Sequence, residues 1–148
     1  RANGSEIRYL ARGDEITLAP EIRALVLAPG EDERGTGNAQ SMVLKISYGD
    51  GSLLMTGDLP VELESGAAAP AALIKAAHHG SRDATGELLL QAASPAACVI
   101  SVGSTRGPSR QLLDALARNG ILPLRTDQSG AISADILPDG TLQVRTYK

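Results

Sequence analysis

The sequence predicts an α/β fold with a mixed β-sheet and flanking helices, and three observations support this prediction. Strand-like apolar runs fill the first half of the chain, and strands alternate with helical segments in the second half. An Asp-Gly pair at Asp50–Gly51 separates two apolar runs, which is typical of a β-hairpin. The segment Ser109–Gly120 has leucines at helical spacing between a capping serine and an Asn-Gly stop.

The first half of the chain is expected to form strands. Glu6–Leu10 and Glu15–Leu18 flank a turn-like Ala-Arg-Gly-Asp, and the apolar run Ile22–Pro29 stops at a proline. The polar, glycine-containing segment Gly30–Gln40 is predicted to be a loop. The two hairpin strands are then expected at Ser41–Gly49 and Ser52–Asp58.

The second half is expected to alternate between strands and helices. Helical structure is predicted for Pro60–Pro70 (one or two turns), for Thr85–Ala93 with Thr85 as the N-cap, and for Ser109–Gly120. Strands are predicted at Ala72–His79, Ala97–Gly103, Ile121–Asp127, Gly130–Ile136 and Thr141–Lys148, the last two joined around Pro-Asp-Gly.

Length and composition restrict the function. With 148 residues, residues 1–148 are expected to form one domain with a real core. Aromatic residues make up only 2%, so the chain has little material for stacking on bases, and a net charge of -3 gives no global attraction to nucleic acid. Cys98 is the only cysteine, which excludes an intrachain disulfide and a cysteine-cluster metal site.

Three residues are the strongest candidates for chemistry. Asp58 follows an apolar strand where the chain leaves the sheet, which is where α/β proteins place ligands, although it could equally cap the turn before Pro60. His78 and His79 are the only histidines, and neutral imidazole is the commonest metal ligand. Adjacent side chains of a strand point to opposite faces, so one histidine is expected to reach a given site unless the chain turns at Gly80. The alternative is a turn histidine beside an exposed one.

Other polar residues follow strands as well. Asn38 precedes a strand and could hydrogen-bond a phosphate, but turn chemistry alone explains it. Arg106 and Arg110 lie near a helix start, where backbone N–H groups and guanidinium groups favour an anion, or they are simply solvated. Asp127 is interpreted as a turn residue.

Taken in order, several segments resemble ComEC-type DNA-uptake competence proteins, in the C-terminal part of their metallo-β-lactamase-like domain. The segments are NAQSMVLKISYGDGSLLMTGDL, LIKAAHHGSRDAT, CVISVGSTRG and LLDALARNGILPLRTDQSGAISADI. The resemblance implies an αβ/βα sandwich with a one- or two-metal site at one edge. Asp58 matches a metal-bridging or metal-adjacent aspartate, and His78 and His79 match a His-His-Gly-Ser pair in which one histidine is a ligand or faces the site.

The resemblance also assigns roles to other residues. The chain departs from the family's pattern at two places. Asp58 and His79 would be catalytic, the metal would be zinc or manganese, and Ser81, Arg106 or Arg110 would contact phosphate. Asn38 matches a position where relatives of the wider fold place a further histidine. The family's His-x-His-x-Asp-His segment is absent, so the chain is expected to be a truncated, C-terminal half-domain. The Asn-x-Tyr-Gly-His-Pro stretch of the family is replaced by SVGSTRGPSR.

Two functions remain open at this point. The parent protein would process incoming DNA by metal-dependent phosphodiester hydrolysis, with the isolated chain inactive and binding metal weakly or not at all. Alternatively, this is a degenerate structural or DNA-binding domain of the translocation complex, or part of a soluble ComEC-like hydrolase. The expected partners are DNA, the missing half-domain and membrane channel segments. The expected location is the outer face of the bacterial cytoplasmic membrane.

A half-sandwich would leave one apolar face without a partner sheet. We expect this face to carry Leu25, Leu27, Leu54, Ile74 and Ile100 and to meet water. Because an exposed apolar surface of this size favours association, the chain is predicted to form a homodimer.

Overall fold

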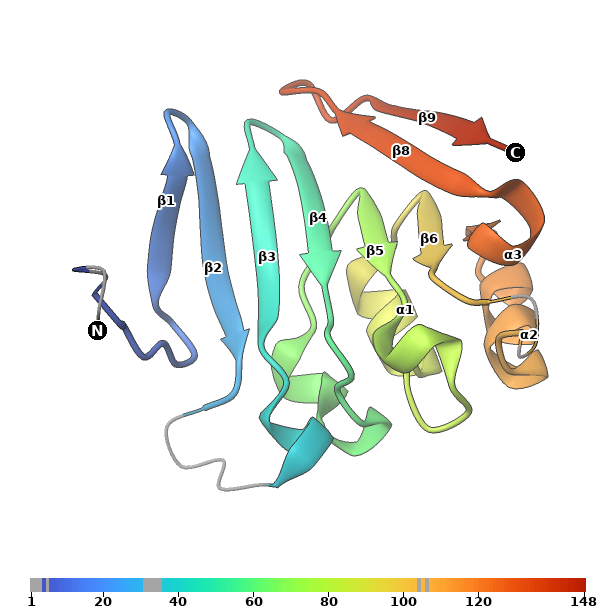
Figure 1. Ribbon diagram of the computed structural model, residues 1–148, viewed down its shortest axis with the longest axis horizontal. Coiled ribbons are helices and arrows are strands. Elements are labelled where there is room, and N and C mark those ends of the chain that lie inside the picture. Colours follow the sequence, from blue (N-terminus) through green and yellow to red (C-terminus); the bar gives the residue numbers. More distant parts are fainter. Residues whose placement is uncertain (1–3, 5, 31–35, 104, 106) are drawn as a thin grey trace.

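A seven-stranded β-sheet runs through the molecule (Figure 1). Its strands lie side by side in the same order as in the sequence, from β1 to β7. The computed structural model describes residue 4 and residues 6–30, 36–103, 105 and 107–148. The strands of this sheet are β1 (Glu15–Ala19), β2 (Ile22–Ala28), β3 (Val43–Tyr48), β4 (Gly51–Met55), β5 (Leu73–Lys75), β6 (Ala97–Ile100) and β7 (Leu122–Arg125). A separate antiparallel hairpin consists of β8 (Ala131–Ile136) and β9 (Leu142–Tyr147).

The sheet is mixed, which confirms the predicted class. Strands β1 to β4 pair antiparallel, and β4 to β7 pair parallel. The predicted hairpin joins β3 and β4, but its two turn residues are Gly49 and Asp50, because Tyr48 and Gly51 are partners in the ladder. Gly49 has a φ of 57°, a value that glycine adopts without steric cost.

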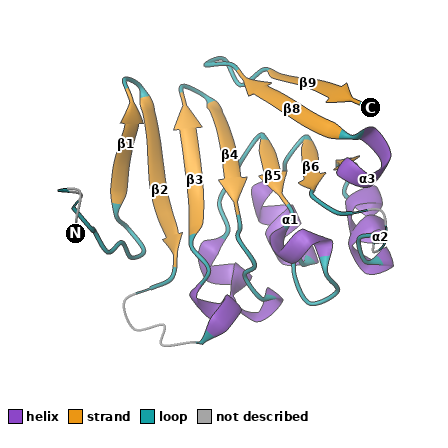
Figure 2. Ribbon diagram, in the orientation of Figure 1, coloured by secondary structure: helices purple, strands orange, loops and turns teal. Residues whose placement is uncertain are grey.

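Helical segments connect the parallel strands and pack on one face of the sheet. They are η2 (Val61–Ala67), α1 (Glu87–Ala93) and α2 (Arg110–Arg118), and each contributes buried side chains to the same core. Crossovers between sequential parallel strands have one hand, which places them on one face. Shorter turns are η1 (Gly37–Gln40), η3 (Ala77–Gly80) and α3 (Thr126–Ser129). Figure 2 shows the helical segments gathered towards the edge where β4, β5 and β6 end. No helix in the described ranges has the length and apolar character needed to cross a bilayer.

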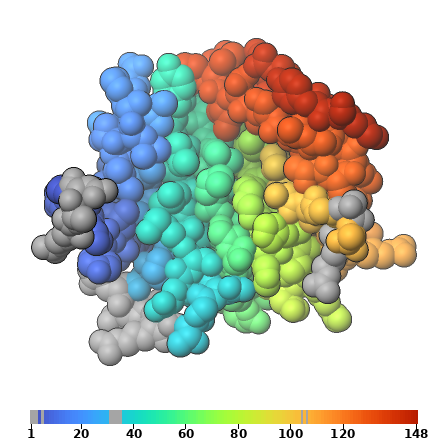
Figure 3. Space-filling view, in the orientation of Figure 1, coloured from blue at the N-terminus to red at the C-terminus, as the bar shows by residue number. Residues whose placement is uncertain are grey.

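The two faces of the sheet are buried by different elements. On the helical face, Leu54, Ile74 and Cys98 occupy one row of paired positions and are fully buried. On the opposite face, Leu73 and Ala97 pack with side chains of the β8–β9 hairpin, including Ile132. Figure 3 shows this hairpin, orange to red, lying over part of the sheet while the blue-to-green strands reach the surface beside it. The C-terminal hairpin therefore covers part of the second face.

This arrangement corrects the prediction of a bare apolar face. Leu54, Ile74 and Ile100 are fully buried in the helical core, and Leu25 and Leu27 are partly buried. The five residues do not form one exposed surface, because the chain supplies its own cover. The reason given for a homodimer is therefore wrong, and the oligomeric state stays a prediction for light scattering.

Several expected elements also differ from the structure; for example, the strand expected at Ile121–Asp127 ends at Arg125, and α3 begins at Thr126. Residues 6–10 form no strand, and β1, which was expected to pair with them, lies at the edge of the sheet and pairs with β2 alone among the described strands. Strand β5 ends at Lys75, so the histidines lie in a turn and not in a strand. Helix α1 begins at Glu87 with Gly86 as its N-cap, not Thr85. By contrast, Ser109 caps α2 as predicted, since its Oγ accepts a hydrogen bond from the Leu112 N–H at 3.2 Å.

Candidate functional site

The candidate residues lie along one edge of the sheet. Because β4, β5, β6 and β7 are parallel, the segments that follow their carboxyl ends meet at the same edge. Asp58 follows β4, His78 and His79 follow β5, Ser101 follows β6 and Thr126 follows β7. The segment before β3 reaches this edge too, because β3 runs antiparallel to β4.

The loop that carries Asp58 is held against the segment before β3. The Asp58 N–H donates a hydrogen bond to Ser41 Oγ at 3.1 Å. Gly57 has a φ of 56°, and a Cβ atom there would lie 3.1 Å from the Ser41 Cβ. The Ser41 N–H in turn donates to the Asn38 carbonyl oxygen at 3.0 Å, while the Asn38 side chain is exposed. The backbone carbonyl of Asn38, and not its side chain, is thus connected to the Asp58 loop through Ser41.

The two histidines occupy a strained turn. His78 has φ 45° and ψ 44°, and His79 has φ 56° and ψ 25°, both in the left-handed region that non-glycine residues rarely adopt. Strained backbone of this kind gathers at functional sites and needs support from its surroundings. Part of that support is a hydrogen bond from the His78 N–H to the Gly57 carbonyl oxygen at 3.0 Å. This bond ties the histidine turn to the Asp58 loop.

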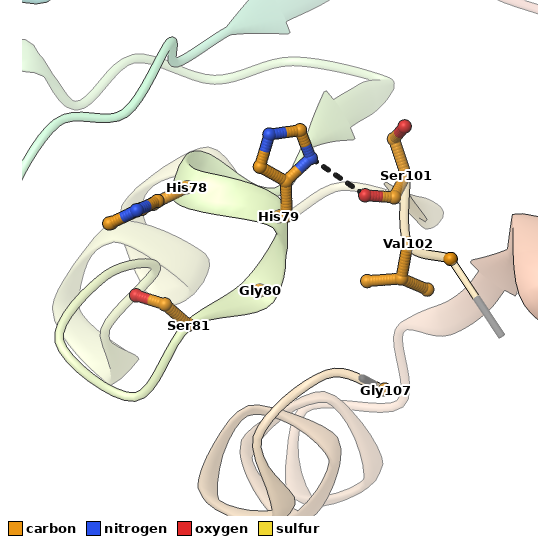
Figure 4. Close-up of a pocket in the computed structure, with 8 residues that line it drawn as sticks. His78, His79, Gly80, Ser81, Ser101, Val102 and Gly107 are labelled. Atoms are coloured by element: carbon orange, nitrogen blue, oxygen red, sulfur yellow. Dashed lines mark hydrogen bonds between the residues drawn. The ribbon is translucent and has the colours of Figure 1, made fainter. Parts of the chain in front are cut away.

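The side chains of the two histidines point in different directions (Figure 4). His79 Nδ1 lies 2.8 Å from the Ser101 carbonyl oxygen. A carbonyl oxygen only accepts hydrogen bonds, so we assign the proton of the neutral ring to Nδ1. The lone pair on Nε2 is then available to bind a ligand, and the Ser101 carbonyl fixes the ring orientation. Metal-binding histidines are commonly oriented in this way.

A cavity of about 390 Å³ lies beside the histidine turn. Residues from the two segments that follow β5 and β6 line it: His78, His79, Gly80, Ser81, Ser101, Val102, Gly103 and Gly107. Figure 4 shows the Ser81 hydroxyl on the same side as the His78 ring. The structure therefore brings three candidate residues, His78, His79 and Ser81, into one hollow.

Residues after β7 support the far wall of this cavity. Thr126 Oγ accepts a hydrogen bond from the Val102 N–H at 2.8 Å. The guanidinium of Arg125 holds the Asp127 carboxylate with two hydrogen bonds, at 3.1 and 2.6 Å, which lowers the pKa of Asp127. A Cβ atom at Gly107 would lie 3.2 Å from Arg125 Nη2. The sequence indicates only a turn residue at Asp127, and the arginine two positions earlier is the signal for its ion pair.

The two arginine candidates are placed differently from the histidines. Arg110 is the first residue of α2, and it is exposed, with its Nε 3.8 Å from Asp114. It is not among the residues that line the cavity. Arg106 lies outside the described residues.

One polar residue at this edge was not among the candidates that the sequence pattern indicated. Lys75, the last residue of β5, is half-buried, and its ammonium group donates a hydrogen bond to the Gly57 carbonyl oxygen at 3.4 Å. This is the same oxygen that accepts from the His78 N–H. A lysine inside a short buried strand is unusual, and that pattern could have drawn attention to it.

The described candidate residues do not form a metal site by themselves. In the part of the chain that the structure describes, no group of three or more His, Cys, Asp or Glu side chains is placed to hold a metal ion. Zinc in a hydrolase takes three protein ligands and an open position. The described residues do not fit that requirement by themselves, although His79 offers an oriented nitrogen at the site.

Two known competence proteins are similar to this chain in sequence. The chain is 34% identical over 140 residues to ComE operon protein 3 of Bacillus subtilis, a match that covers 89% of the chain and 18% of that protein. It is 31% identical over 133 residues to the competence protein ComA of Neisseria gonorrhoeae, covering 82% of the chain and 19% of that protein. The chain is a homologue of part of these competence proteins. It spans about a fifth of the length of each, as those shares show. No family model matches it.

A solved structure shows the fold. A protein of Parabacteroides distasonis, assigned as a metal-dependent hydrolase, matches this competence-protein homologue with a TM-score of 0.53 and 16% identity. The match covers 82% of this chain and 58% of that protein. The fold is therefore α/β with a mixed sheet and flanking helices, as expected from the sequence, and it is similar to the fold of this structure.

Proposed function

We propose that this chain is the C-terminal part of a ComEC-type metallo-β-lactamase-like domain whose complete form hydrolyses phosphodiester bonds of incoming DNA. The observation that carries the proposal is the His79 ring, which the Ser101 carbonyl oxygen orients in a turn that the His78 N–H ties to the Asp58 loop through the Gly57 carbonyl oxygen. The similarity to two competence proteins supports the DNA-uptake context. A divalent metal, zinc or manganese, would supply an activated water and polarise the phosphate when bound.

The chain's own residues would have distinct roles. Asp58 and His79 would provide ligand atoms on one side of the metal, with further ligands from the half-domain outside this chain. His78 is the alternative histidine ligand. Ser81 lines the cavity and would hydrogen-bond a phosphate oxygen, and Lys75 would add positive charge at the same edge. Asn38, Arg106 and Arg110 remain proposed phosphate contacts on the basis of the sequence.

The test is cleavage by the longer domain that contains this chain. Fluorescent linear DNA would be incubated with that domain and manganese or zinc, in single- and double-stranded forms. We expect metal-dependent cleavage that Asp58→Asn and His79→Gln abolish. Asp139→Asn is the matched control, because it makes the same chemical change on an exposed hairpin turn. Intact DNA after incubation of the wild-type domain with either metal would refute the hydrolase proposal.

The isolated chain gives a second test. Titration calorimetry of the 148 residues with zinc or manganese should show weak binding or none, because too few ligands are assembled among the described residues. Tight binding that disappears in Asp58→Ala would mean that this chain builds a site alone, and the proposal of a shared site would then be wrong.

A non-catalytic role is the second candidate, and the loop after β6 favours it. This loop reads SVGSTRGPSR and lacks the histidine and tyrosine expected from the resemblance. A structural or DNA-binding domain of a translocation complex would bind DNA without cleaving it. Gel-shift and cleavage assays on the same longer domain separate the two functions, and an upstream His-x-His-x-Asp-His segment in the parent sequence would favour the enzyme.

The proposed location and partners follow from the same context. The chain would lie on the outer face of the cytoplasmic membrane as part of a larger membrane protein, next to its channel segments. An Asp139→Cys variant of the parent protein tests this, because Cys98 is buried and the new thiol is exposed. Labelling by a membrane-impermeant maleimide on intact spheroplasts is expected. Labelling only after lysis would place the chain inside the cell.

A further inference from the structure

Glu64 is a buried carboxylate with no role in the site described so far. It lies on η2 with 2% of its surface exposed, and it is the one acidic or basic side chain that is buried among the described residues. Burial raises the pKa of Glu64, against the opposing effect of hydrogen bonds from Gly86 and Thr85. Charged side chains are almost never fully buried unless they are paired or hydrogen-bonded, so this position calls for an explanation.

The hydrogen bonds of Glu64 hold the loop between the histidine turn and α1. One carboxylate oxygen accepts from the Thr85 N–H, and the other accepts from the Gly86 N–H at 2.7 Å. Gly86 is the N-cap of α1 and has no side chain to cap it. Glu64 therefore satisfies the N–H of the N-cap residue, one of the four N–H groups at the start of a helix that lack a partner within it, from a distant element.

Thr85 carries the effect of Glu64 back to the histidines. It is 3% exposed and has a φ of 58°, an unfavourable conformation for a β-branched residue. Its Oγ accepts a hydrogen bond from the Ala77 N–H at 2.8 Å. Ala77 directly precedes His78 and His79, which are strained in the same left-handed region. The contacts thus run from Glu64 through Thr85 to the start of the histidine turn.

We propose that Glu64 is a positioning residue that holds the strained segment 77–86 and thereby orients the His79 ring. An effect of Glu64 on catalysis rests on the proposed function. The link from Glu64 to the histidine turn can be tested without that function. A plain helix cap would stabilise α1 alone. A positioning residue must also change the histidine turn, which begins nine residues before Gly86.

The first experiment compares Glu64→Gln with Glu87→Gln in the 148-residue chain. Both variants exchange a carboxylate for an amide at the same end of α1. The amide introduced by Glu64→Gln has a single acceptor oxygen for two N–H donors, so amide hydrogen exchange at Thr85 or Gly86 should accelerate about tenfold or more. We also expect faster exchange at Ala77 and a changed ¹⁵N signal of His79 Nδ1. Neither change is expected in Glu87→Gln.

A second pair of variants tests the Thr85 step without disturbing Glu64. Thr85→Val keeps the β-branched shape and removes the hydroxyl, whereas Thr85→Ser keeps the hydroxyl. Exchange at Ala77 and the His79 signal should change in Thr85→Val and return to wild-type behaviour in Thr85→Ser. If Glu64→Gln and Thr85→Val affect only the amides of α1, and Ala77 and His79 behave as in the wild type, Glu64 is only a helix cap.

The longer domain separates this inference from the proposed function. If the domain cleaves DNA, Glu64→Gln should lower kcat with little change in KM for DNA, because the histidine and not DNA binding is affected. If the wild-type domain does not cleave DNA but Ala77 and His79 still respond to Glu64→Gln, the hydrolase proposal fails and the positioning role stands. An unchanged kcat in the Glu64→Gln domain would show that the position of the histidine turn, as set by Glu64, does not affect cleavage.

Discussion

The His78 N–H donates a hydrogen bond to the Gly57 carbonyl oxygen at 3.0 Å. This bond joins two loops that are 21 residues apart in sequence and lie side by side because β4 and β5 are parallel neighbours. The same oxygen accepts from the ammonium group of Lys75 at 3.4 Å. Gly57 is thus the point at which the Asp58 loop, the histidine turn and strand β5 meet, and its conformation should matter for all three.

Gly57→Ala should destabilise the fold. Its φ of 56° is unfavourable for alanine, and the new Cβ would lie 3.1 Å from the Ser41 Cβ and 3.3 Å from the Met42 carbonyl oxygen. We expect a loss of about 1–2 kcal/mol from the left-handed conformation, and more from the contact with Ser41. Urea unfolding measures it. Gly103→Ala is the matched control, since a Cβ there meets nothing within 4 Å. Equal stabilities of the two variants would contradict the prediction.

When the His79 ring is neutral, its proton should be on Nδ1. The Ser101 carbonyl oxygen, 2.8 Å away, accepts from this nitrogen and stabilises that tautomer. Long-range ¹H–¹⁵N correlation at a pH where the ring is neutral should show a protonated Nδ1 and an unprotonated Nε2 for His79. His78, whose ring makes no such contact with the described residues, is the internal control. A proton on Nε2 of His79 would remove the available nitrogen from the proposed site.

Ser109→Ala should weaken the start of α2. The hydroxyl oxygen accepts from the Leu112 N–H at 3.2 Å, and replacing such a cap costs about 1 kcal/mol. The loss should appear in thermal or urea unfolding of the chain. Ser109→Asp preserves a capping oxygen and should retain most of the stability. If the aspartate variant is as unstable as the alanine variant, the hydroxyl does not act as a cap.

Arg118→Ala should raise the pKa of Glu87. Arg118 donates to the Glu87 carboxylate at 2.6 Å and Asn119 donates at 2.5 Å, and both lower the pKa of that carboxyl. A carboxylate whose pKa is lowered by folding contributes stability above its unfolded pKa, and this contribution is lost as the pH falls through its folded pKa. Removing Arg118 should therefore shift the NMR titration of Glu87 upward and reduce the stability lost in acid. Arg110→Ala, on the same helix, should leave the Glu87 titration unchanged.

Local patterns in the sequence determined most of the elements and the class of fold. The Asp-Gly hairpin, the capped helix at Ser109 and the closing strands are encoded by residues near one another, so propensity and turn chemistry suffice to predict them. The same patterns located Asp58, His78 and His79 at strand ends. They placed the histidines in a strand, however, and the left-handed turn overrides that pattern because contacts from Gly57 and Thr85 hold it.

Only the tertiary structure decided which residues meet. The tautomer of His79 depends on Ser101, 22 residues away, and the N–H of Gly86, the N-cap residue of α1, bonds to Glu64, 22 residues earlier. The helical segments cover the sheet face that was expected to be bare, because they bury Leu54 and Ile74. The β8–β9 hairpin packs on the opposite face, where Ile132 contacts the cluster around Leu73. Contacts of this kind join distant segments, and their existence depends on strand order and on which face each side chain occupies. Periodicity along the chain reports neither, which is why the sequence could name candidate site residues but not their arrangement.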